Sequence, residues 1–521
     1  MRRKSFLFSV LIITLSCMIL MKLELQTVKT KPYSNINVYE AYNMTMNNSY
    51  PDLVVLDVRT QSEYESGHIY KSIWIPHTEL KGRIGELSGH EDHEVIVYCR
   101  SGNRSENASA TLESLDFTKV YNMLGGIQAW ESAGYTIWIA AIHNLNTTIS
   151  YDTIQAAIDA PQTLDGHRIL VEAGTYYEPI VVSKSLSLFG ENRNTTIIDG
   201  NGTGAVIDPI LNWTAIVHVV ADDVYISFFT IRNGGFHGLV LDSTVNCTIE
   251  NVMSVESNSC ISLMNSEGNS ISNSEFSRGL WGVFLFNSTE NEIVTNVISG
   301  NLHAGIATGG PNGSTMNFIA NNTVTHNINP SMGDVYGYGL DIVGFDNRIL
   351  DNIISNNNNG IILDFGRRNQ LEGNVISNNT YYGIRLVRDS NNNTFFANTI
   401  EDSGLVGLVI SSGTNNVFHH NNFVDNRIQV YVVASGTIWD NGVEGNYWSD
   451  YIERYPNATR LNGIWDTPYV IDDYNQDNYP IVPEFPSLII IPLFMTITLL
   501  VSLMYRRKLI KCTVHALLQT G

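Results

Sequence analysis

An internal repeat in the second half of the chain constrains its fold more than any other feature of the sequence. A motif of asparagine, any residue and, in all copies but one, an apolar residue recurs every 22 to 30 residues, at Asn251, Asn273, Asn296, Asn322, Asn352, Asn374, Asn398 and Asn421. Each repeat also carries a glycine followed by an apolar residue. Periods of this length, with short apolar strands between turns, are typical of solenoids whose repeats pack only against their neighbours.

The composition of the repeats favours a β-solenoid. Leucine-rich repeats have similar periods, but they need a leucine framework and a helix in every repeat, and the sequence has neither. Asparagine suits the turns because it tolerates left-handed backbone and its amide can bond to the equivalent residue of the next coil. We therefore predict a right-handed parallel β-helix over residues 145–480, with a short amphipathic helix at 152–158 that caps its open end.

Residues 35–140 show a different pattern, in which apolar strands alternate with segments compatible with helices. Strands are predicted near 53–57, 94–98 and 120–124, which indicates a parallel sheet with helices on both faces. The overall prediction is a multidomain chain: an α/β domain, then an all-β parallel β-helix, with hydrophobic segments at both ends. Cys99 directly follows the second of these strands, at the carboxyl end where such sheets bind ligands.

Cys99 begins a short loop that combines a thiol with groups that attract anions. A tight turn at Gly102 can point several backbone N–H groups inward, and a helix beginning near Ser105 adds its positive end. These groups favour the thiolate, which is the nucleophilic form of cysteine. We therefore predict Cys99 as the catalytic residue. The predicted anion- and substrate-binding loop consists of Arg100, Ser101, Gly102, Asn103, Arg104 and Ser105.

The first domain resembles the single-domain rhodanese family throughout its length. The residues that carry the resemblance are Asp57-Val58-Arg59, Glu63-Tyr64, Gly67-His68-Ile69, Ile75-Pro76, the 99–105 loop, and Gly125-Gly126 with Trp130. The resemblance implies a sulfurtransferase that needs no cofactor: Cys99 takes sulfur from a sulfane-sulfur donor as a persulfide and passes it to a thiol acceptor. Only four residues separate Cys99 from Arg104, a loop length similar to that of the sulfurtransferases and shorter than in related arsenate reductases and phosphatases.

Some of the polar residues that carry this resemblance are expected to stabilise the fold and not to take part in the chemistry. We expect Asp57 and Arg59 to tie a strand end to its surroundings, and His68 to be structural as well. Lys71-Ser72 stands where the rhodanese family usually has Gly-Ala. This departure affects packing near the sheet more than the chemistry at Cys99.

The second domain resembles NosD-type proteins and the β-helix families that bind or hydrolyse carbohydrate. The resemblance rests on residues 171–176 and 197–200 at the entrance, and on 445–450, 466–469 and 478–480 at the far end. It is specific for the fold, and copper binding does not carry over. The histidines at 303, 326, 419 and 420 have no Met or Cys partners in the sequence pattern, so no metal site is predicted.

Three roles for the β-helix remain open. Aromatic residues that could stack on sugars favour a binding module for polysaccharide or another surface ligand: Trp281, Phe365, Tyr381 and Tyr382. A second possibility is a non-catalytic cell-surface carbohydrate-binding or adhesion protein. A third is a polysaccharide lyase or hydrolase, for which Asp222, Asp223 and Asp341 are candidate residues. Asp472, Asp473 and Asp477 could hold Ca²⁺, although a solvated acidic loop is the interpretation we favour.

Both ends of the chain carry apolar runs next to basic clusters. The first predicts a signal peptide or uncleaved signal anchor within residues 1–26. The second predicts a transmembrane helix at 487–505 with a basic cytoplasmic tail at 506–521. Pro483-Glu484-Phe485 before it resembles the PEF-type sorting signals of archaeal surface proteins. The chain is therefore predicted to lie in the cell membrane, with most of its length outside the cytoplasm.

Charge and cysteine content limit the partners further. The formal net charge is -21, which argues against a nucleic-acid partner because such a partner needs a basic face. Cys99 has no neighbouring cysteine in the sequence. Cys247 and Cys260 either pair with each other or are buried separately as free thiols.

Overall fold

The computed structural model describes residues 33–482, except 48, 139–140, 203, 209–212 and 312. The chain divides into two compact units, Met1–Ala157 and Ile158–Gly521. The predicted signal segment, the PEF sequence, the transmembrane helix and the basic tail lie outside the described residues. Within the described part, no helix has the length and apolar character needed to cross a bilayer.

The first unit contains a five-stranded parallel sheet with the strand order β1-β5-β4-β2-β3. The strands are β1 (Ser34–Ile36), β2 (Val54–Asp57), β3 (Ile73–Trp74), β4 (Glu94–Tyr98) and β5 (Lys119–Met123). The helices are α2 (Val38–Thr45), α3 (Gln61–Glu65), the 3₁₀ helix η1 (Ile84–Leu87), α4 (Asn103–Glu113) and α5 (Gly126–Ser132). The predicted α/β architecture is confirmed, and the three predicted strands form as β2, β4 and β5.

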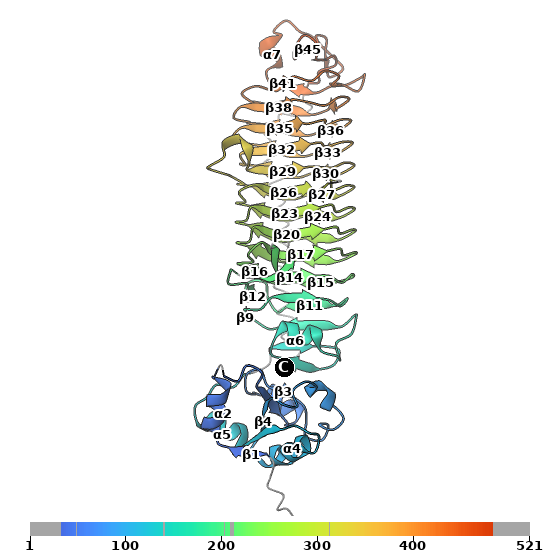
Figure 1. Ribbon diagram of the computed structural model, residues 1–521. Helices are drawn as coiled ribbons and strands as arrows, with labels where there is room; N and C mark the ends of the chain where they lie inside the picture. Colours follow the sequence, from blue (N-terminus) through green and yellow to red (C-terminus); the bar gives the residue numbers. More distant parts are fainter. Residues whose placement is uncertain are drawn as a thin grey trace, which may run out of the picture. The chain divides into compact units, whose positions relative to one another are not determined.

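Alternation of side chains along β4 divides the core of this sheet in two. Val95 and Val97 pack in a cluster with α4, whereas Ile96 and Tyr98 pack in a second cluster with α2 and α5. This is the two-residue period of a strand that is covered on both faces. The helices accordingly lie on either side of the sheet (Figure 1). Cys99 belongs to the cluster on the α4 side.

The predicted amphipathic helix forms as α6 (Ile154–Asp159), after an antiparallel pair of strands, β6 (Ile142–Asn144) and β7 (Ile149–Tyr151). The second unit then forms stacked coils, each of which contributes one strand to each of three parallel sheets (Figure 1). The predicted parallel β-solenoid is therefore confirmed.

The first sheet consists of β10 (Ile180–Val182), β14 (Trp213–Val219), β17 (His237–Asp242), β20 (Ser259–Met264), β23 (Trp281–Phe286), β26 (Ala304–Gly309), β29 (Tyr338–Ile342), β32 (Asn359–Asp364), β35 (Tyr382–Val387), β38 (Val406–Ile410) and β41 (Val430–Val432), with β13 (Ala205–Asp208) antiparallel to β14. The second includes β8 (Arg168–Val171), β11 (Ser187–Gly190), β15 (Tyr225–Ser227), β18 (Thr248–Glu250), β21 (Ser270–Ser272), β24 (Glu292–Val294), β27 (Phe318–Ala320), β30 (Arg348–Leu350), β33 (Gln370–Glu372), β36 (Thr394–Phe396) and β39 (Val417–His419).

The third sheet consists of β9 (Gly174–Tyr176), β12 (Thr196–Asp199), β16 (Thr230–Arg232), β19 (Met253–Val255), β22 (Glu275–Ser277), β25 (Val297–Ser299), β28 (Thr323–Thr325), β31 (Ile353–Ser355), β34 (Val375–Ser377), β37 (Thr399–Glu401), β40 (Asn422–Val424) and β42 (Tyr447–Trp448). A 3₁₀ helix, η2 (Gly333–Val335), precedes β29. The coils end in α7 (Tyr451–Arg454) and two short antiparallel pairs, β43 (Arg460–Leu461) with β44 (Ile464–Trp465) and β45 (Tyr469–Val470) with β46 (Gln476–Asp477).

Apolar side chains at equivalent positions of successive coils fill the interior. One such column in the first sheet is almost completely buried and comprises Val217, Leu239, Ile261, Val283, Ile306, Leu340, Ile361, Ile384 and Leu408. Each member lies directly over its neighbour because the strands are parallel and in register. The hydrophobic contribution to stability therefore comes from contacts between adjacent coils.

Buried asparagines link the coils at the turns. Asn374 is representative: its Oδ1 accepts the backbone N–H of Asn352 at 3.0 Å and the Nδ2 of Asn352 at 2.9 Å. Its own Nδ2 donates to the carbonyl of Ile349 at 2.7 Å and to Oδ1 of Asn398 at 2.9 Å. Every polar atom of the side chain is thereby satisfied without water, as a buried amide requires.

Three columns of such asparagines run through the solenoid. The first comprises Asn269, Asn291, Asn317, Asn347, Asn369, Asn393 and Asn416. The second comprises Asn296, Asn322, Asn352, Asn374, Asn398, Asn421 and Asn446, and the third Asn301, Asn327, Asn357 and Asn379. Most of the asparagines of the sequence repeat therefore belong to the second column.

Two members of the predicted repeat, Asn251 and Asn273, occupy a different place. Each precedes the column position by one residue and has left-handed backbone, with φ of 52° and 51°. The column positions of these two coils are taken by Val252 and Ser274, and Ser274 Oγ accepts the N–H of Val252 at 3.0 Å. The predicted register is wrong by one residue here because asparagine suits both consecutive turn positions.

The free cysteines of the β-helix are buried separately. Cys247 and Cys260 form no disulfide. Of the two predicted alternatives, separate burial as free thiols is therefore the correct one. Burial raises the pKa of the Cys260 thiol to about 12, which keeps it protonated and unreactive.

Asp477 lies at the end of the second asparagine column. The prediction that it belongs to a solvated acidic loop is wrong. Its side chain is fully buried, and its Oδ2 accepts the N–H of Asn446 at 2.7 Å and the indole N–H of Trp448 at 3.0 Å. Its Oδ1 accepts the N–H of Tyr479 at 3.0 Å. Burial outweighs these hydrogen bonds and raises the pKa of Asp477 to about 6.

Replacing Asn374 by alanine is expected to destabilise the solenoid by about 2–4 kcal/mol, because the N–H of Asn352 and the carbonyl of Ile349 lose their partner in the interior. Denaturant unfolding of the variant measures the loss. The matched control is Asn258→Ala, since this asparagine is exposed. Equal stability of the two variants would contradict a structural role for the columns.

The raised pKa of Asp477 predicts a pH-dependent stability. Because the folded state holds the proton more tightly than the unfolded state, this group's contribution is complete below about pH 4 and is lost as the pH rises through about 6. The loss amounts to about 2–3 kcal/mol. Unfolding measured from pH 4 to 7.5 should show this decline, and Asp477→Asn should remove it; an unchanged pH profile in the variant would refute the assignment.

Candidate functional site

Cys99 lies at the carboxyl end of β4, and its loop turns directly into α4. Gly102 is the residue before the helix and has φ of 106°, a left-handed conformation that glycine adopts without strain. Helix α4 begins at Asn103, two residues earlier than predicted. Gly126 packs against the base of the loop, where a Cβ atom would lie 2.2 Å from the carbonyl oxygen of Cys99. Glycine at this position therefore permits the close approach of the two loops.

Hydrogen-bond donors surround the thiol. The N–H of Gly102 donates to Cys99 Sγ at 3.1 Å, and the hydroxyl of Ser105 lies 3.6 Å from it. The side chain is only 1% exposed. Burial pushes the pKa of Cys99 upward, but the Ser105 hydroxyl and the N–H groups of Ser105, Gly102 and Ser101 outweigh it, so the pKa is lowered overall. The arrangement thus stabilises a thiolate.

The Ser105 hydroxyl is held in place by a residue that the sequence did not reveal. Ser105 Oγ lies 2.7 Å from Oδ1 of Asn122 on β5 and 3.0 Å from the carbonyl of Gly102. Nδ2 of Asn122 donates to Oδ1 of Asn35 at 2.9 Å, so Asn122 Oδ1 is an acceptor that competes with Cys99 Sγ for the single proton of the Ser105 hydroxyl. Asn122 lies among the apolar residues of β5. A polar residue at a buried strand position is the one sequence feature that could have indicated its role.

The two arginines of the loop differ in their surroundings. Arg104 forms a bidentate ion pair with Glu63 of α3, with both N···O distances at 2.7 Å. The hydrogen bond from Arg104 lowers the pKa of Glu63 to about 2, so the pair stays charged. Arg100 is exposed, as are Ser101 and Asn103. Arg100 is consequently the loop cation without an ion-pair partner among the described residues.

Asp57, Arg59 and His68 have the structural roles expected of them. The Arg59 guanidinium donates to Asp57 at 2.6 Å and to the carbonyl of Gly67 at 2.7 Å, with both side chains buried. His68 bonds to the carbonyl of Tyr64 through Nδ1 and to Asp152 through Nε2. These interactions tie the end of β2 to the segment that follows α3.

The candidate acidic residues of the β-helix do not converge. Asp222 and Asp223 accept hydrogen bonds from Val245 and Asn246 in a neighbouring turn, whereas Asp341 lies in β29 beside His303. Throughout the described residues, no group of three or more His, Cys, Asp or Glu side chains is placed to hold a metal ion. The aromatic candidates are better aligned: Trp281 and Tyr382 share one register position of the first sheet.

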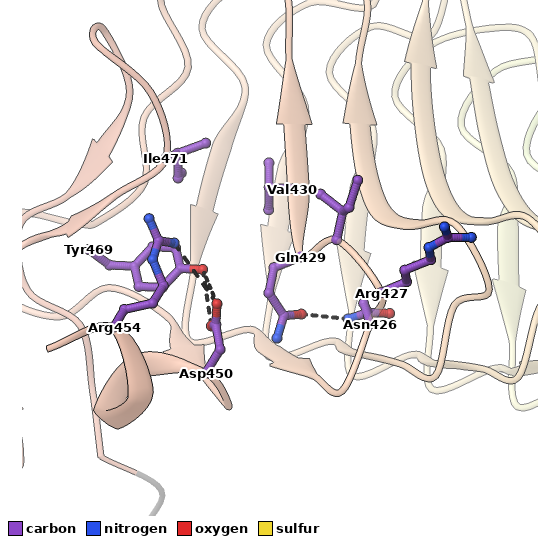
Figure 2. A pocket seen from close by; sticks show the side chains of 9 residues that line it. Asn426, Arg427, Gln429, Val430, Asp450, Arg454, Tyr469 and Ile471 are labelled. Carbon is purple, nitrogen blue, oxygen red and sulfur yellow. Dashed lines mark hydrogen bonds and ion pairs between the residues drawn. The ribbon is translucent and has the colours of Figure 1, made fainter. Parts of the chain in front are cut away.

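A cavity of about 400 Å³ lies between the last coil and the C-terminal segment of the second unit (Figure 2). Its polar groups pair with one another: the Tyr469 hydroxyl donates to Asp450 at 3.0 Å, and the Arg454 guanidinium lies 4.3 Å from the Tyr469 ring centroid. Arg454 also donates to the carbonyl of Val470 at 2.6 Å. The cavity is therefore a joint between the solenoid and its end rather than a reactive site.

Comparison with known proteins assigns both halves of the chain. Residues 38–133 match the family model "Rhodanese-like domain". Residues 214–333 match "Right handed beta helix region", and residues 309–452 match "Periplasmic copper-binding protein (NosD)".

Individual proteins are similar to parts of this chain. A sulfurtransferase of Allochromatium vinosum is 36% identical over 86 residues, which cover 16% of this chain and 78% of that protein. A cell surface glycoprotein of Methanothermus fervidus is 37% identical over 112 residues, 22% of this chain, and the chain spans only 17% of its length. The crystal structure of a rhodanese-related protein from Thermoplasma volcanium is 34% identical, covers 20% of this chain and 99% of that one, and has a TM-score of 0.19. The chain belongs to the rhodanese-like family.

The residues of the NosD-like region do not fit a copper site. Copper prefers thiolate, thioether and imidazole ligands, and residues 309–452 contain no cysteine. His419 and His420 bond to each other through their Nδ1 atoms at 2.9 Å, and Nε2 of His420 is taken by Glu444 at 2.8 Å. The match therefore supports the fold and carries no metal chemistry to this chain.

Ser105→Ala is expected to raise the pKa of Cys99, because the thiolate loses one of its donors. Alkylation by iodoacetamide at pH 7 should then slow several-fold, with its pH midpoint shifted upward. Ser101→Ala is the matched control, since its contribution comes from the backbone N–H and survives the substitution. Identical alkylation profiles for wild type and Ser105→Ala would refute the role assigned to this hydroxyl.

Proposed function

We propose that the chain is a membrane-anchored, extracytoplasmic sulfurtransferase of the rhodanese type, coupled to a β-helix that binds polysaccharide or another surface ligand. The observation that carries the enzymatic part is the lowered pKa of Cys99, produced by loop donors that converge on a buried sulfur. The rhodanese-like family supports this chemistry, as does the sulfurtransferase among its relatives.

The proposed reaction has two steps that return the enzyme to its starting state. The Cys99 thiolate attacks the outer sulfur of a sulfane donor such as thiosulfate; a new S–S bond forms, the donor's S–S bond breaks, and sulfite leaves with the electron pair. An acceptor thiolate or cyanide then attacks the outer sulfur of the persulfide, and Cys99 leaves as thiolate. No cofactor is needed for either step.

The loop supports both steps electrostatically. The N–H groups of Ser101, Gly102 and Ser105 stabilise the negative sulfur whenever it forms, as donors in a preorganised site do. Arg100 is free to attract the anionic donor to the mouth of the loop. Arg104 shares its charge with Glu63, so its main task in this proposal is to hold the loop to α3.

Other observations support the proposed location of the chain and the proposed role of the β-helix. The sequence runs at 1–26, a signal peptide or signal anchor, and at 487–505 support membrane attachment with the bulk of the chain outside the cytoplasm. The relatives are described as a periplasmic protein and a cell surface glycoprotein, which agrees with that location. Aromatic side chains on the outer face of the first sheet support a binding role, and the separated acidic candidates give no support to a lyase or hydrolase.

Purified protein treated with excess thiosulfate should gain one sulfur atom on Cys99, detected by mass spectrometry. The rate should rise with pH and level off below the pH expected for an ordinary cysteine, because the Cys99 pKa is lowered. Cys99→Ser should abolish transfer to cyanide.

The protein supplies its own controls for this experiment. Cys247 and Cys260 are buried with raised pKa values, so neither should take up sulfur. An unmodified Cys99 under excess donor would reject the proposed activity.

A further inference from the structure

The outer face of the first sheet carries a cluster of aromatic side chains apart from the solenoid interior. Trp281 and Phe284 of β23 stack at 5.2 Å between ring centroids. The ring of His303, just before β26, lies 5.3 Å from Trp281 and 4.4 Å from Tyr336. These side chains pack around buried Ala304 and Ala307, and the cluster contains none of the interior column. Large rings around two small residues form an uneven aromatic surface on the outer face of the first sheet.

Polar groups with free hydrogen-bonding capacity border this cluster. Asp341 lies 3.3 Å from Nε2 of His303. The guanidinium of Arg385 lies 4.7 Å from the Tyr382 ring centroid, and its buried Nε has no partner among the described residues. Asn359 is 1% exposed, and its Oδ1 likewise lacks a partner in the described part of the chain. The half-buried side chains of Asp341 and Arg385 could bond to ligand hydroxyls, whereas the buried Arg385 Nε and Asn359 Oδ1 atoms are closed to a ligand.

The solenoid departs from its regular period at the same place. Asparagines of the second column are 22 to 25 residues apart except on either side of Asn322, where the spacing is 26 and then 30. The extra residues lie after β26 and before β29, at the two ends of the strands that carry the cluster. Asn359 Nδ2 holds the second insertion through the carbonyls of Asp334 and Tyr336. Insertions in solenoids often mark the binding face.

The charges of this region oppose an acidic ligand. Two carboxylates, Asp334 and Asp341, accompany the guanidinium of Arg385, and the whole chain carries a formal net charge of -21. A polyanion would meet long-range repulsion here. Aromatic rings pack on the apolar faces of sugar rings, while carboxylate, amide and guanidinium groups bond to hydroxyls. The features together match an uncharged, hydroxyl-rich chain.

We propose that this face, centred on Trp281, Asp341 and Arg385, is a binding site for an uncharged polysaccharide. The proposal rests on the binding role proposed for the β-helix, which it narrows to one face and one class of ligand. From Trp281 to Tyr382 the register spans four strand spacings, about 19 Å along the coil axis. That length accommodates several sugar rings laid across the strands.

Titration calorimetry of the full chain in detergent tests the site with three probes: maltohexaose, cellohexaose and hexagalacturonate. At least one neutral oligosaccharide should bind more tightly than hexagalacturonate. Trp281→Ala and Arg385→Gln should each weaken that binding about tenfold, the loss expected for one stacked or hydrogen-bonded group. Asp341→Asn, which keeps the side-chain shape, should also weaken it. Sulfur uptake by Cys99 should stay unchanged in all three variants.

The matched control is Tyr431→Ala, an exposed aromatic at the Arg385 register position two strands further along; its binding should equal that of wild type. If Trp281→Ala and Asp341→Asn, shown to be folded by their melting curves, bind as tightly as wild type, the site is wrong although the binding role survives. Tighter binding of hexagalacturonate would overturn the ligand class. Failure of wild type to bind any of the three would overturn both proposals.

Discussion

The hydrogen bond between buried asparagine amides of adjacent coils is the interaction on which the second unit depends. An amide can donate and accept at once. An asparagine such as Asn374 accepts a backbone N–H of the preceding coil, and donates both to a carbonyl of that coil and to the amide oxygen of the next asparagine. The apolar columns supply much of the free energy of folding. The amides reinforce the register of the coils, because a one-residue slip would leave buried donors and acceptors unpaired.

In the first unit, the central interaction is the stabilisation of a negatively charged sulfur at a buried position. It places a nucleophilic sulfur among apolar side chains, where burial alone would keep the thiol protonated. The loop reverses that preference with short-range donors: the N–H groups of the turn at left-handed Gly102, and the Ser105 hydroxyl. The ion pair between Arg104 and Glu63 fixes the far side of the loop. The two units thus share a feature, since the buried Cys99 sulfur and the buried column amides both meet hydrogen-bond partners that the fold holds in position.

The sequence predicted the architecture because each unit has its own periodic pattern of apolar residues: alternating strands and helices in the first, and a repeat of 22 to 30 residues in the second. Strand alternation gave β2, β4 and β5, and the coil period gave the solenoid with in-register sheets. The errors concern neighbouring residues with interchangeable chemistry: Asn251 and Asn273 were assigned to a column although they occupy the left-handed position before it. Asp477 looked like a surface carboxylate, and only the three-dimensional turn shows that it is buried. For the site, the Cys99 loop was evident, but Asn122 and the engagement of Arg104 depend on contacts between distant strands and helices that no local pattern records.

The closure of the second column by Asp477 has a consequence for self-association. A solenoid that ended on another asparagine would expose amide donors and a template for the coil of a second molecule, the usual route to end-to-end fibrils. An ionised carboxylate only accepts hydrogen bonds, and the indole of Trp448 and the backbone of Tyr479 already occupy it. The second column therefore presents no amide donor at this end to the coil of a second molecule.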